Sequence, residues 1–302
     1  MTVARGRIRR PRLASPPVRI SYFGVRGSCP CSSDEQRRYG GNTSCVLVEV
    51  DGEPPLILDM GTGLRALGHH LAATQQATGL PLRATALLTH LHYDHVLGTP
   101  FFPPMRDPGA LLEVYGPAQE DGSLHAAMAA MVRPPFFPVA MDGFRGELRF
   151  HDLDPSAPLH LGPIVVRAQP VSHVGTTFGY RIEADGVALV YLPDHQAPLD
   201  RSTVPPEVRR LCEGADLLLH DAQYTDEEFA ELADWGHSTP GYAVRVAAES
   251  QVGRLDLFHH DPAHADDQLD EMLAAARAIS GQIGGPEVHS AREGQSVEVG
   301  GR

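Results

Sequence analysis

A dense run of potential metal ligands, placed directly after an apolar segment, constrains this chain more than any other feature. Residues 84–89 form a short, mostly apolar stretch that predicts a buried strand. The residues at and beyond its end are Thr89, His90, Leu91, His92, Tyr93, Asp94 and His95. On a turn that leaves a strand, His90 and His92 can point to the same side, while Asp94 and His95 reach a neighbouring point. The run therefore indicates a site at this turn where two adjacent cations could bind.

Most isolated histidines are core or surface residues, and a chain with 16 of them must contain several such bystanders. The density of the run outweighs that reading, because imidazole and carboxylate groups at this spacing match the ligands that zinc and its neighbours prefer. We expect the remaining isolated histidines to be solvated or structural, namely His69, His70, His125, His151, His160, His264 and His289.

Length and composition predict one globular domain over residues 20–302. The chain has 302 residues, of which 42% are hydrophobic and 21% charged, so it can bury a substantial core. No run approaches the roughly 18 to 20 apolar residues that span a bilayer. Since the N-terminus carries no secretory signal, we expect a cytoplasmic protein without membrane contact.

Charge separates the N-terminus from the rest of the chain. Residues 1–19 contain six arginines and no acid, which predicts a disordered basic tail; contact of the tail with nucleic acid or anionic lipid is the alternative. The net charge of the whole chain is −13, so its body should repel long polyanions. All 25 basic residues are arginine, which excludes catalysis by a Walker-type lysine or a Schiff base.

The cysteines are too few for a disulfide scaffold and fit a reducing compartment. They are Cys29, Cys31, Cys45 and Cys212. The first three could bind a structural metal, although no fourth ligand is evident. The other reading, which we favour, is that they are small buried thiols.

The order of strand and helix signals predicts sheets stacked between helices. The first half contains a helix over 64–77 and strands over 20–25, 45–50, 56–59 and 84–89, of which the first three form a β-meander. The second half contains helices over 239–249 and 266–279 and strands over 165–168, 178–184, 187–192, 217–220 and 254–258. Two halves that each run from strands to helices indicate helical layers outside the sheets.

Residues 99–146 differ in amino-acid composition from both halves. They hold five phenylalanines among many prolines, with one predicted helix over 123–132. Such a segment can stack against a planar substrate or close over a site as a lid. A packed irregular excursion is the alternative.

The pattern Thr-His-x-His-x-Asp-His after a strand resembles the signature of the metallo-β-lactamase superfamily, and the resemblance extends across the chain. It implies an α+β four-layer αββα sandwich, in which two mixed β-sheets are flanked by helices and metals lie at one edge between the sheets. It also implies a binuclear centre with two divalent ions, expected to be Zn²⁺, with Mn²⁺ or Fe²⁺ as alternatives.

Later strand ends supply further ligands in this family. The implied set is His90, His92 and His173 for one ion, Asp94, His95 and His259 for the other, and Asp194 bridging both. A slip of one position in the last strand would replace His259 by His260, and we favour His259. His92 stands where the redox branch of the superfamily usually carries glutamate, so hydrolysis is favoured over electron transfer.

Two cations that share a carboxylate and a water lower the pKa of that water from about 15.7 toward about 7, so a metal-bound hydroxide exists at neutral pH. Two further segments resemble the ribonuclease Z branch, whose enzymes cleave phosphodiesters: residues 220–223 and residues 236–239. The resemblance implies that His237 binds the phosphate or protonates the leaving oxygen while Asp221 holds its ring. Together with Asp94 these are the predicted catalytic residues. In the alternative, His237 only flanks a helix that begins near Pro240.

Glycine-rich segments at 40–45 and 59–63 also resemble family elements, since glycine allows tight turns beside the metals. Asp59 either orients a ligand histidine or stabilises a turn.

One departure from ribonuclease Z bears on the substrate. Those enzymes commonly insert a basic arm that grips transfer RNA, whereas about twenty residues separate His173 from Asp194 here. We therefore expect no large structured RNA partner and predict a small phosphodiester such as a cyclic nucleotide, as in cyclic phosphodiesterases of the same group. Aromatic residues of 99–146 could stack a base, and Arg106, Arg133 or Arg145 could offset phosphate charge.

Two rival functions remain at this stage. A thioester or lactone hydrolase, like glyoxalase II or a lactonase, would use the same metal centre. A metal-stabilised binding module without activity is the third reading, and a homodimer is possible with any of them.

Overall fold

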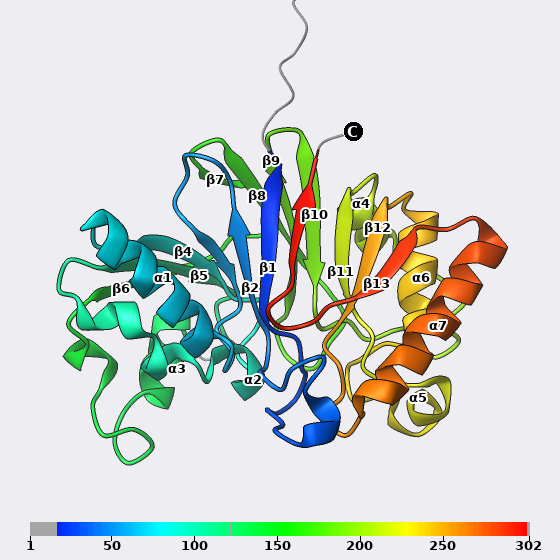
Figure 1. Cartoon of the computed structure of the whole chain (residues 1–302), viewed down its shortest axis with the longest axis horizontal. Helices are drawn as coiled ribbons and strands as arrows, with labels where there is room; N and C mark the ends of the chain where they lie inside the picture. Colours follow the sequence, from blue (N-terminus) through cyan, green and yellow to red (C-terminus); the bar gives the residue numbers. More distant parts are fainter. Residues whose placement is uncertain (1–16, 121, 301–302) are drawn as a thin grey trace, which may run out of the picture.

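The computed structural model describes residues 17–120 and 122–300, whose strands form two mixed seven-stranded sheets (Figure 1). The first sheet has the order β14-β1-β2-β3-β4-β5-β6, with β1 (Val18–Gly24), β2 (Cys45–Glu49), β3 (Leu56–Leu58), β4 (Arg83–Leu87), β5 (Leu111–Gly116), β6 (Glu147–Asp152) and β14 (Ser296–Val299). The second has the order β13-β12-β11-β10-β9-β8-β7, with β7 (Leu159–Leu161), β8 (Ile164–Pro170), β9 (Phe178–Ala184), β10 (Val187–Leu192), β11 (Leu217–Asp221), β12 (Arg254–Phe258) and β13 (Glu287–Ser290).

Each sheet has an antiparallel side and a parallel side. In the first sheet, β14, β1, β2 and β3 pair antiparallel, and β3 to β6 pair parallel. In the second, β7 to β10 pair antiparallel and β10 to β13 parallel. The chain fills the first sheet, then the second, and returns with β14 beside β1. As in other sheets with parallel strands, the carboxyl ends of these strands are the expected place for a site.

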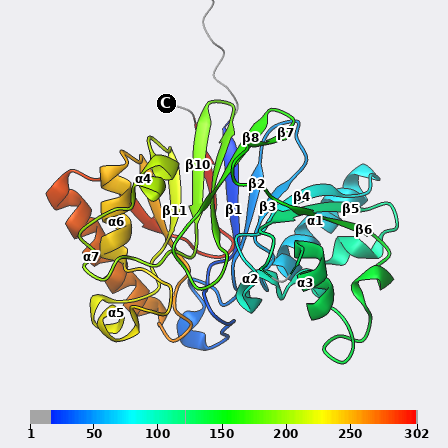
Figure 2. The same cartoon turned by 180° about the vertical axis from the view of Figure 1, so that it is seen from behind.

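Helices cover the outer face of each sheet, as Figures 1 and 2 show from opposite sides. The α-helices are α1 (Leu64–Thr78), α2 (Tyr93–Val96), α3 (Leu124–Met131), α4 (Pro206–Cys212), α5 (Asp226–Leu232), α6 (Pro240–Glu249) and α7 (Asp266–Ile283). Short 3₁₀ turns are η1 (Asp34–Gln36), η2 (Thr99–Phe101), η3 (Pro103–Arg106) and η4 (Met141–Gly143). Helices α1 and α3 pack on the first sheet, and α4, α6 and α7 on the second. The four layers expected from the sequence are confirmed.

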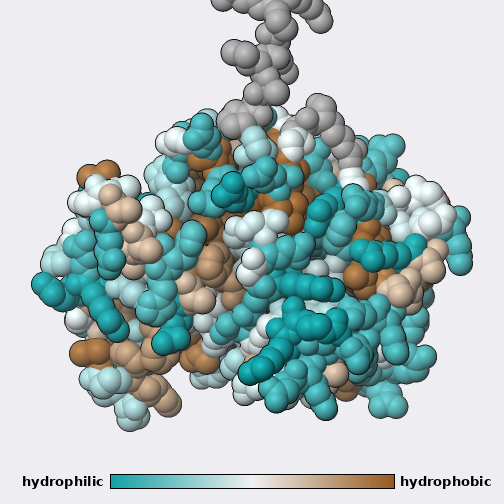
Figure 3. Space-filling model, in the orientation of Figure 1, coloured by the Kyte–Doolittle hydropathy of each residue, from teal (hydrophilic) through white to brown (hydrophobic). Residues whose placement is uncertain are grey.

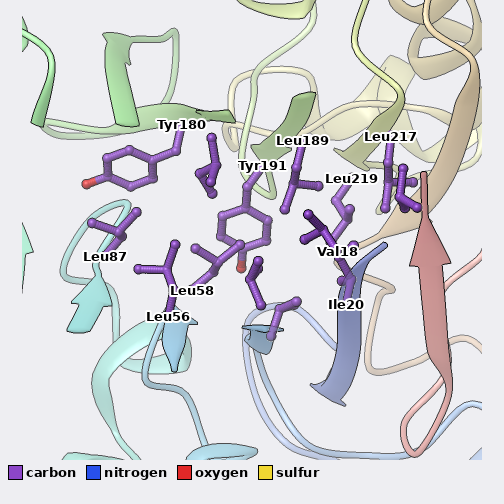
Figure 4. Packing of buried hydrophobic residues seen from close by; sticks show 14 of the residues in the cluster. Val18, Ile20, Leu56, Leu58, Leu87, Tyr180, Leu189, Tyr191, Leu217 and Leu219 are labelled. Atoms are coloured by element: carbon purple, nitrogen blue, oxygen red, sulfur yellow. The ribbon is translucent and has the colours of Figure 1, made fainter. Parts of the chain in front are cut away.

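The main core lies between the two sheets (Figure 4). Ile20 and Leu58 of the first sheet belong to the same buried cluster as Leu189, Tyr191 and Leu219 of the second. Each such side chain contributes roughly 1.5–3 kcal/mol when it is fully removed from water. All six residues of β10 are buried, because this strand has the other sheet on one face and helices on the other.

Local sequence signals account for the connections. The β9–β10 hairpin turns at Asp185 and Gly186, which both have positive φ, as a tight two-residue hairpin requires. Ser123 caps α3 by accepting a hydrogen bond from the Ala126 amide, so the helix predicted over 123–132 is confirmed.

Two boundaries differ from the sequence-based expectation. The segment 99–146 is not wholly irregular, because it contains β5, whose alternating residues Leu112 and Val114 are buried between β4 and β6. The expected tail ends earlier than residue 19: Val18 and Arg19 already pair with β14, and Arg19 forms an ion pair with Glu298. Residues 1–16 of that tail lie outside the described residues.

The cysteines are free in the described chain. The prediction of buried thiols holds for Cys45 and Cys212, whereas Cys31 is half-buried and Cys29 is exposed. Cys29 differs because it follows Ser28 on a loop that crosses the open edge of the sandwich beside Asp94. In the same described ranges, no cluster of potential metal ligands includes a cysteine.

None of the helices in residues 17–120 and 122–300 combines the length and hydropathy that crossing a membrane requires.

One buried polar contact joins the sheets and can be tested. The Tyr22 hydroxyl of β1 donates to Asp256 Oδ2 of β12 at 2.5 Å, and Arg254 Nε donates to the other carboxylate oxygen at 2.7 Å. Both Tyr22 and Asp256 are fully buried. We expect Tyr22→Phe to lower the free energy of unfolding by about 1–3 kcal/mol, because a buried carboxylate loses a donor. Denaturant titration followed by circular dichroism measures this.

Tyr115→Phe is the matched control, since the Tyr115 hydroxyl forms no hydrogen bond with any residue that the structure describes, and a change under about 0.5 kcal/mol is expected. Equal losses in both variants would contradict the stabilising role of the Tyr22 contact.

Candidate metal centre

Five strand ends meet at one edge between the sheets and carry the polar side chains of the site. The edge lies near α2, at the bottom of Figure 1. Asp59 follows β3, His90 follows β4, His173 follows β8, Asp194 follows β10, and His259 follows β12. Asp59 and His259 have φ values of 57° and 59°, so the chain turns sharply as it leaves these two strands.

Three histidines form the first group of the site. His90, His92 and His173 each offer a ring nitrogen, and these atoms all lie within 4.8 Å of one another. Nε2 of His173 is 3.3 Å from a ring nitrogen of His92, and the His90 and His92 ring centroids are 4.4 Å apart. The spacing predicted from the turn after the strand therefore brings His90 and His92 to the same side.

The second group consists of Asp94, His95 and His259, which are all buried. Asp94 Oδ2 lies 3.3 Å from His95 Nε2 and 3.1 Å from His259 Nε2, and the two imidazole nitrogens are 3.3 Å apart. His95 and His259 are 164 positions apart in the chain, so only the packing of one sheet on the other joins them.

Asp194 lies between the two groups. Its Oδ1 is 3.9 Å from His90 Nε2 and 3.7 Å from His173 Nε2. Its Oδ2 is 3.0 Å from His95 Nε2 and 3.3 Å from His259 Nε2. One carboxylate oxygen thus faces each group, which is the arrangement that a bridging ligand requires.

Hydrogen bonds on the far side of the rings orient the histidines. His95 Nδ1 donates to Asp59 Oδ2 at 2.8 Å. His173 Nδ1 donates to the Gly236 carbonyl at 2.7 Å, and His259 Nδ1 donates to Gln223 Oε1 at 2.9 Å. A histidine that donates through Nδ1 presents a free lone pair on Nε2, as metal-binding histidines do. Three rings are therefore aimed into the centre of the cluster.

The electrostatics of the cluster favour cations. Burial raises the pKa of Asp194, but His259, His95 and His90 outweigh it and hold the pKa well below its usual range, so the carboxylate is ionised. Burial lowers the pKa of His95, yet Asp194, Asp94 and Asp59 raise it well above its ordinary value. These three carboxylates therefore stabilise positive charge in the centre of the cluster. His90 Nε2 is buried and has no hydrogen-bond partner among the described residues. Buried anions beside unpartnered imidazole nitrogens fit divalent metal ions.

Two alternatives left open by the sequence are decided by geometry. His260 Nε2 points away from the cluster and lies 3.1 Å from the Ala291 carbonyl, so His259 is the residue that joins Asp94 and His95. Asp59 orients His95 and also accepts hydrogen bonds from the Thr89 amide and the Tyr191 hydroxyl. It therefore supports a candidate ligand in addition to ending a turn.

His237 lies against the cluster and is held by Asp221. Its Nδ1 is 2.9 Å from Asp221 Oδ2 and 3.8 Å from Asp194 Oδ1. Burial lowers the pKa of His237, but Asp221, and next Asp194 and Asp94, outweigh it and raise the pKa to about 9. His237 also precedes a capped helix, as the alternative from the sequence expected: Thr239 caps α6 by accepting a hydrogen bond from the Tyr242 amide. Helix α6 thus begins three positions after His237.

Sequence reasoning missed three parts of the site. Gln223 orients His259, the Ser28 amide donates to Asp94 Oδ2 at 2.7 Å, and Tyr191 holds Asp59. Gln223 lies in the segment 220–223, which resembles the ribonuclease Z branch, so its place in that segment could have indicated a role at the site. Ser28 and Tyr191 carry no such signal, since their partners are distant in sequence.

A pocket of about 870 Å³ opens beside Asp94. The segment 99–146 forms much of its wall through Phe101, Phe136 and Phe137, so the segment lies at the site. The expectation that Arg106, Arg133 or Arg145 faces this site is wrong, because none of the three lines the pocket. Arg106 lines a separate cavity, and Arg133 Nε donates to the Ala130 carbonyl instead.

Comparisons with known proteins agree with this architecture. Residues 56–260 match the family described as "Beta-lactamase superfamily domain", a range that contains every candidate ligand. A protein named "Ribonuclease Z" from Natronomonas pharaonis is 26% identical, over 93% of this chain and 98% of the relative. The metallo-beta-lactamase fold protein YhfI from Bacillus subtilis has a TM-score of 0.69 at 21% identity, over 94% of this chain and 100% of that one. Unliganded yeast PDE1 has a TM-score of 0.67 at 14% identity, over the same shares of the two chains.

The position of His259 depends on a glycine, which allows a test of the second group. A Cβ atom on Gly27 would lie 2.3 Å from His259 Nδ1 and 2.7 Å from Gln223 Oε1. We expect Gly27→Ala to displace the His259 ring and to lower the metal content by about one ion per chain, as measured by atomic emission on the purified protein.

Gly281→Ala is the control, because a Cβ at this position of α7 meets nothing within 4 Å. An unchanged metal content in Gly27→Ala would show that His259 is not a ligand.

Proposed function

The chain belongs to the metallo-β-lactamase superfamily of metal-dependent hydrolases, and on that premise we propose that it is a phosphodiesterase for a small phosphodiester such as a cyclic nucleotide. The relatives named Ribonuclease Z and the fold shared with yeast PDE1 support cleavage of phosphodiesters. The pairing of His237 with Asp221 beside Asp194 is the observation that carries the proposal.

The candidate ligands fit two divalent ions, which the groups around His90 and His95 would hold, with Asp194 between the two groups. Such ions supply Lewis acidity and lower the pKa of water to about 7. Burial raises the pKa of Asp94, but His95 and His259 outweigh it and lower the pKa below its ordinary value, so the carboxylate is ionised. In this proposal Asp94 would hold an ion and accept a hydrogen bond from the attacking water. Ser28 fixes Asp94 through its amide.

His237 serves the leaving group in this proposal. Asp221 accepts from Nδ1, so the ring is fixed and its Nε2 is directed away from Asp221. A ring with a raised pKa carries a proton at neutral pH, and can donate it to a phosphate oxygen or to the departing alkoxide. An alkoxide needs this proton more than a thiolate does, because a thiolate is a stable anion. The pair therefore favours phosphodiesters over thioesters.

The hairpin between His173 and Asp194 supports a small substrate. This interval is filled by β9 and β10 with a two-residue turn, which leaves no room for an RNA-binding arm. The net charge of −13 also opposes binding of a long polyanion. A thioester or lactone substrate is the second candidate, since the pocket beside Asp94 has a largely apolar wall.

A substrate panel tests the function. We expect metal-loaded protein to hydrolyse bis(p-nitrophenyl) phosphate and cyclic nucleotides, chelation to abolish turnover, and added Zn²⁺ or Mn²⁺ to restore it. Release of p-nitrophenol and chromatography of nucleotides measure the two reactions. Turnover of thioesters or lactones alone would replace the phosphodiesterase by the second candidate.

A histidine substitution tests the role of His237. We expect His237→Ala to lower kcat for a phosphodiester by roughly 10²–10⁴, because the leaving oxygen loses its acid, while the metal content stays unchanged. Stopped assays and atomic emission on the same sample give both values.

His289→Ala is the control, since this histidine contacts Glu287 on an outer strand. Loss of metal together with activity in His237→Ala would instead make His237 a ligand.

A further inference from the structure

The pocket beside the metal centre shares residues with it. Asp94 and Ser28 line the pocket, and Ser28 donates the hydrogen bond that fixes Asp94. Whatever occupies the pocket therefore lies next to the atoms that react. Its volume of about 870 Å³ falls in the range of pockets that enclose small molecules.

The chemistry of the lining excludes a second anionic group. Among the described residues, the only charged side chain of the lining is Asp94, which is itself an anion. Of the described residues that the segment 99–146 contributes to the wall, only Gln119 has a polar side chain. Away from the ion that Asp94 would help to hold, an additional phosphate or carboxylate would lose water and meet no basic side chain in the lining that the structure describes.

Large apolar side chains stand exposed around this pocket in the free protein. Tyr93 is 70% exposed, Phe101 52% and Phe136 77%. Phe101 packs edge-to-face on Phe137, with the two ring centroids 5.8 Å apart, and this contact restrains the Phe101 ring. Met131 adds a flexible apolar side chain to the wall. Figure 3 shows apolar side chains gathered at the lower left, where the segment after α3 lies in Figure 1. Exposed aromatic residues gathered at one pocket mark a binding surface.

The arginines of this segment do not alter that picture. Arg133 Nε is engaged by the Ala130 carbonyl, and Arg106 lines a cavity on the other side of Phe101 and Phe137. Apart from Gln119, the described part of the wall that this segment contributes is therefore apolar.

We propose that this pocket binds an uncharged aromatic or apolar group of the substrate, attached to the ester that reacts at the metal centre, and selects against substrates with a second anion there. The inference rests on the proposed function for the bond that is cleaved. Contact of the group with Phe101 and Phe136 sets the specificity, while the metal centre and His237 act on the phosphate.

Two diesters with the same charge and leaving group test the preference. Bis(p-nitrophenyl) phosphate carries an aromatic ring on the group that stays, and methyl p-nitrophenyl phosphate carries a methyl. On metal-loaded protein we expect kcat/KM to be about tenfold to a hundredfold higher for the first, because it buries a ring in the pocket. Equal values would overturn the inference without touching the proposed function.

Binding without turnover separates the two claims. By titration calorimetry on the metal-loaded protein, phenylphosphonate should bind about tenfold or more tightly than methylphosphonate, and 4-carboxyphenylphosphonate more weakly than phenylphosphonate. If the phosphonates bind in this order but the protein hydrolyses no diester, the proposed function is contradicted while the preference of the pocket for an uncharged ring stands. The absence of this order would overturn the preference.

Substitutions on the surface locate the effect. We expect Phe101→Ala and Phe136→Ala each to lower the ratio of the two kcat/KM values at least threefold, and both side chains are exposed enough that the fold should tolerate the change. Leu80→Ala, at a side chain that is 68% exposed and lies outside the pocket, should leave the ratio as in the native protein. An unchanged ratio in both phenylalanine variants would overturn the role of this pocket.

Discussion

Burying several carboxylates at the junction of two sheets is the constraint on which the rest of this structure depends. Asp59, Asp94, Asp194 and Asp221 are all at least nine-tenths buried. An ionised carboxylate taken from water costs several kcal/mol even after the protein relaxes around it. The surrounding imidazoles and backbone donors offset that cost in part, and the proposed divalent ions would complete the compensation. The edge of the sandwich is therefore stable only with its partners in place.

Most of the facing surface of the two sheets serves packing, and one edge of both sheets carries the candidate site. Along most of their length their facing residues are apolar, and this core sets the distance between them (Figure 4). At the carboxyl ends of the parallel strands the same spacing brings His95 and Asp94 from one sheet to His259 and Asp194 from the other. The metal centre is thus a product of sheet packing, and a slip of one residue in either sheet would turn its side chains away.

In the proposed function, specificity comes from outside the sandwich. The candidate ligands and their orienting partners follow strand ends, whereas the pocket wall belongs to the segment 99–146 and the proposed acid, His237, precedes α6. Such connecting segments can change without disturbing the core, which is how one fold supports different substrates. The apolar wall and the short β9–β10 hairpin both favour a small ester over a structured polyanion.

The sequence by itself determined the local parts of this protein: the strands with period-two burial, the capped helices, and the ligand run from His90 to His95. Strands β9, β10 and β12 have the predicted bounds, because apolar alternation and Asp-Gly turns are local signals. Resemblance to a family then supplied the order of His173, Asp194 and His259. Only the tertiary structure decided that His259 and not His260 faces Asp94, that Gln223 and Tyr191 support the site, and that no arginine of 99–146 lines its pocket. These outcomes depend on contacts between residues far apart in the chain, 132 positions for Tyr191 and Asp59, and no spacing within the sequence records them.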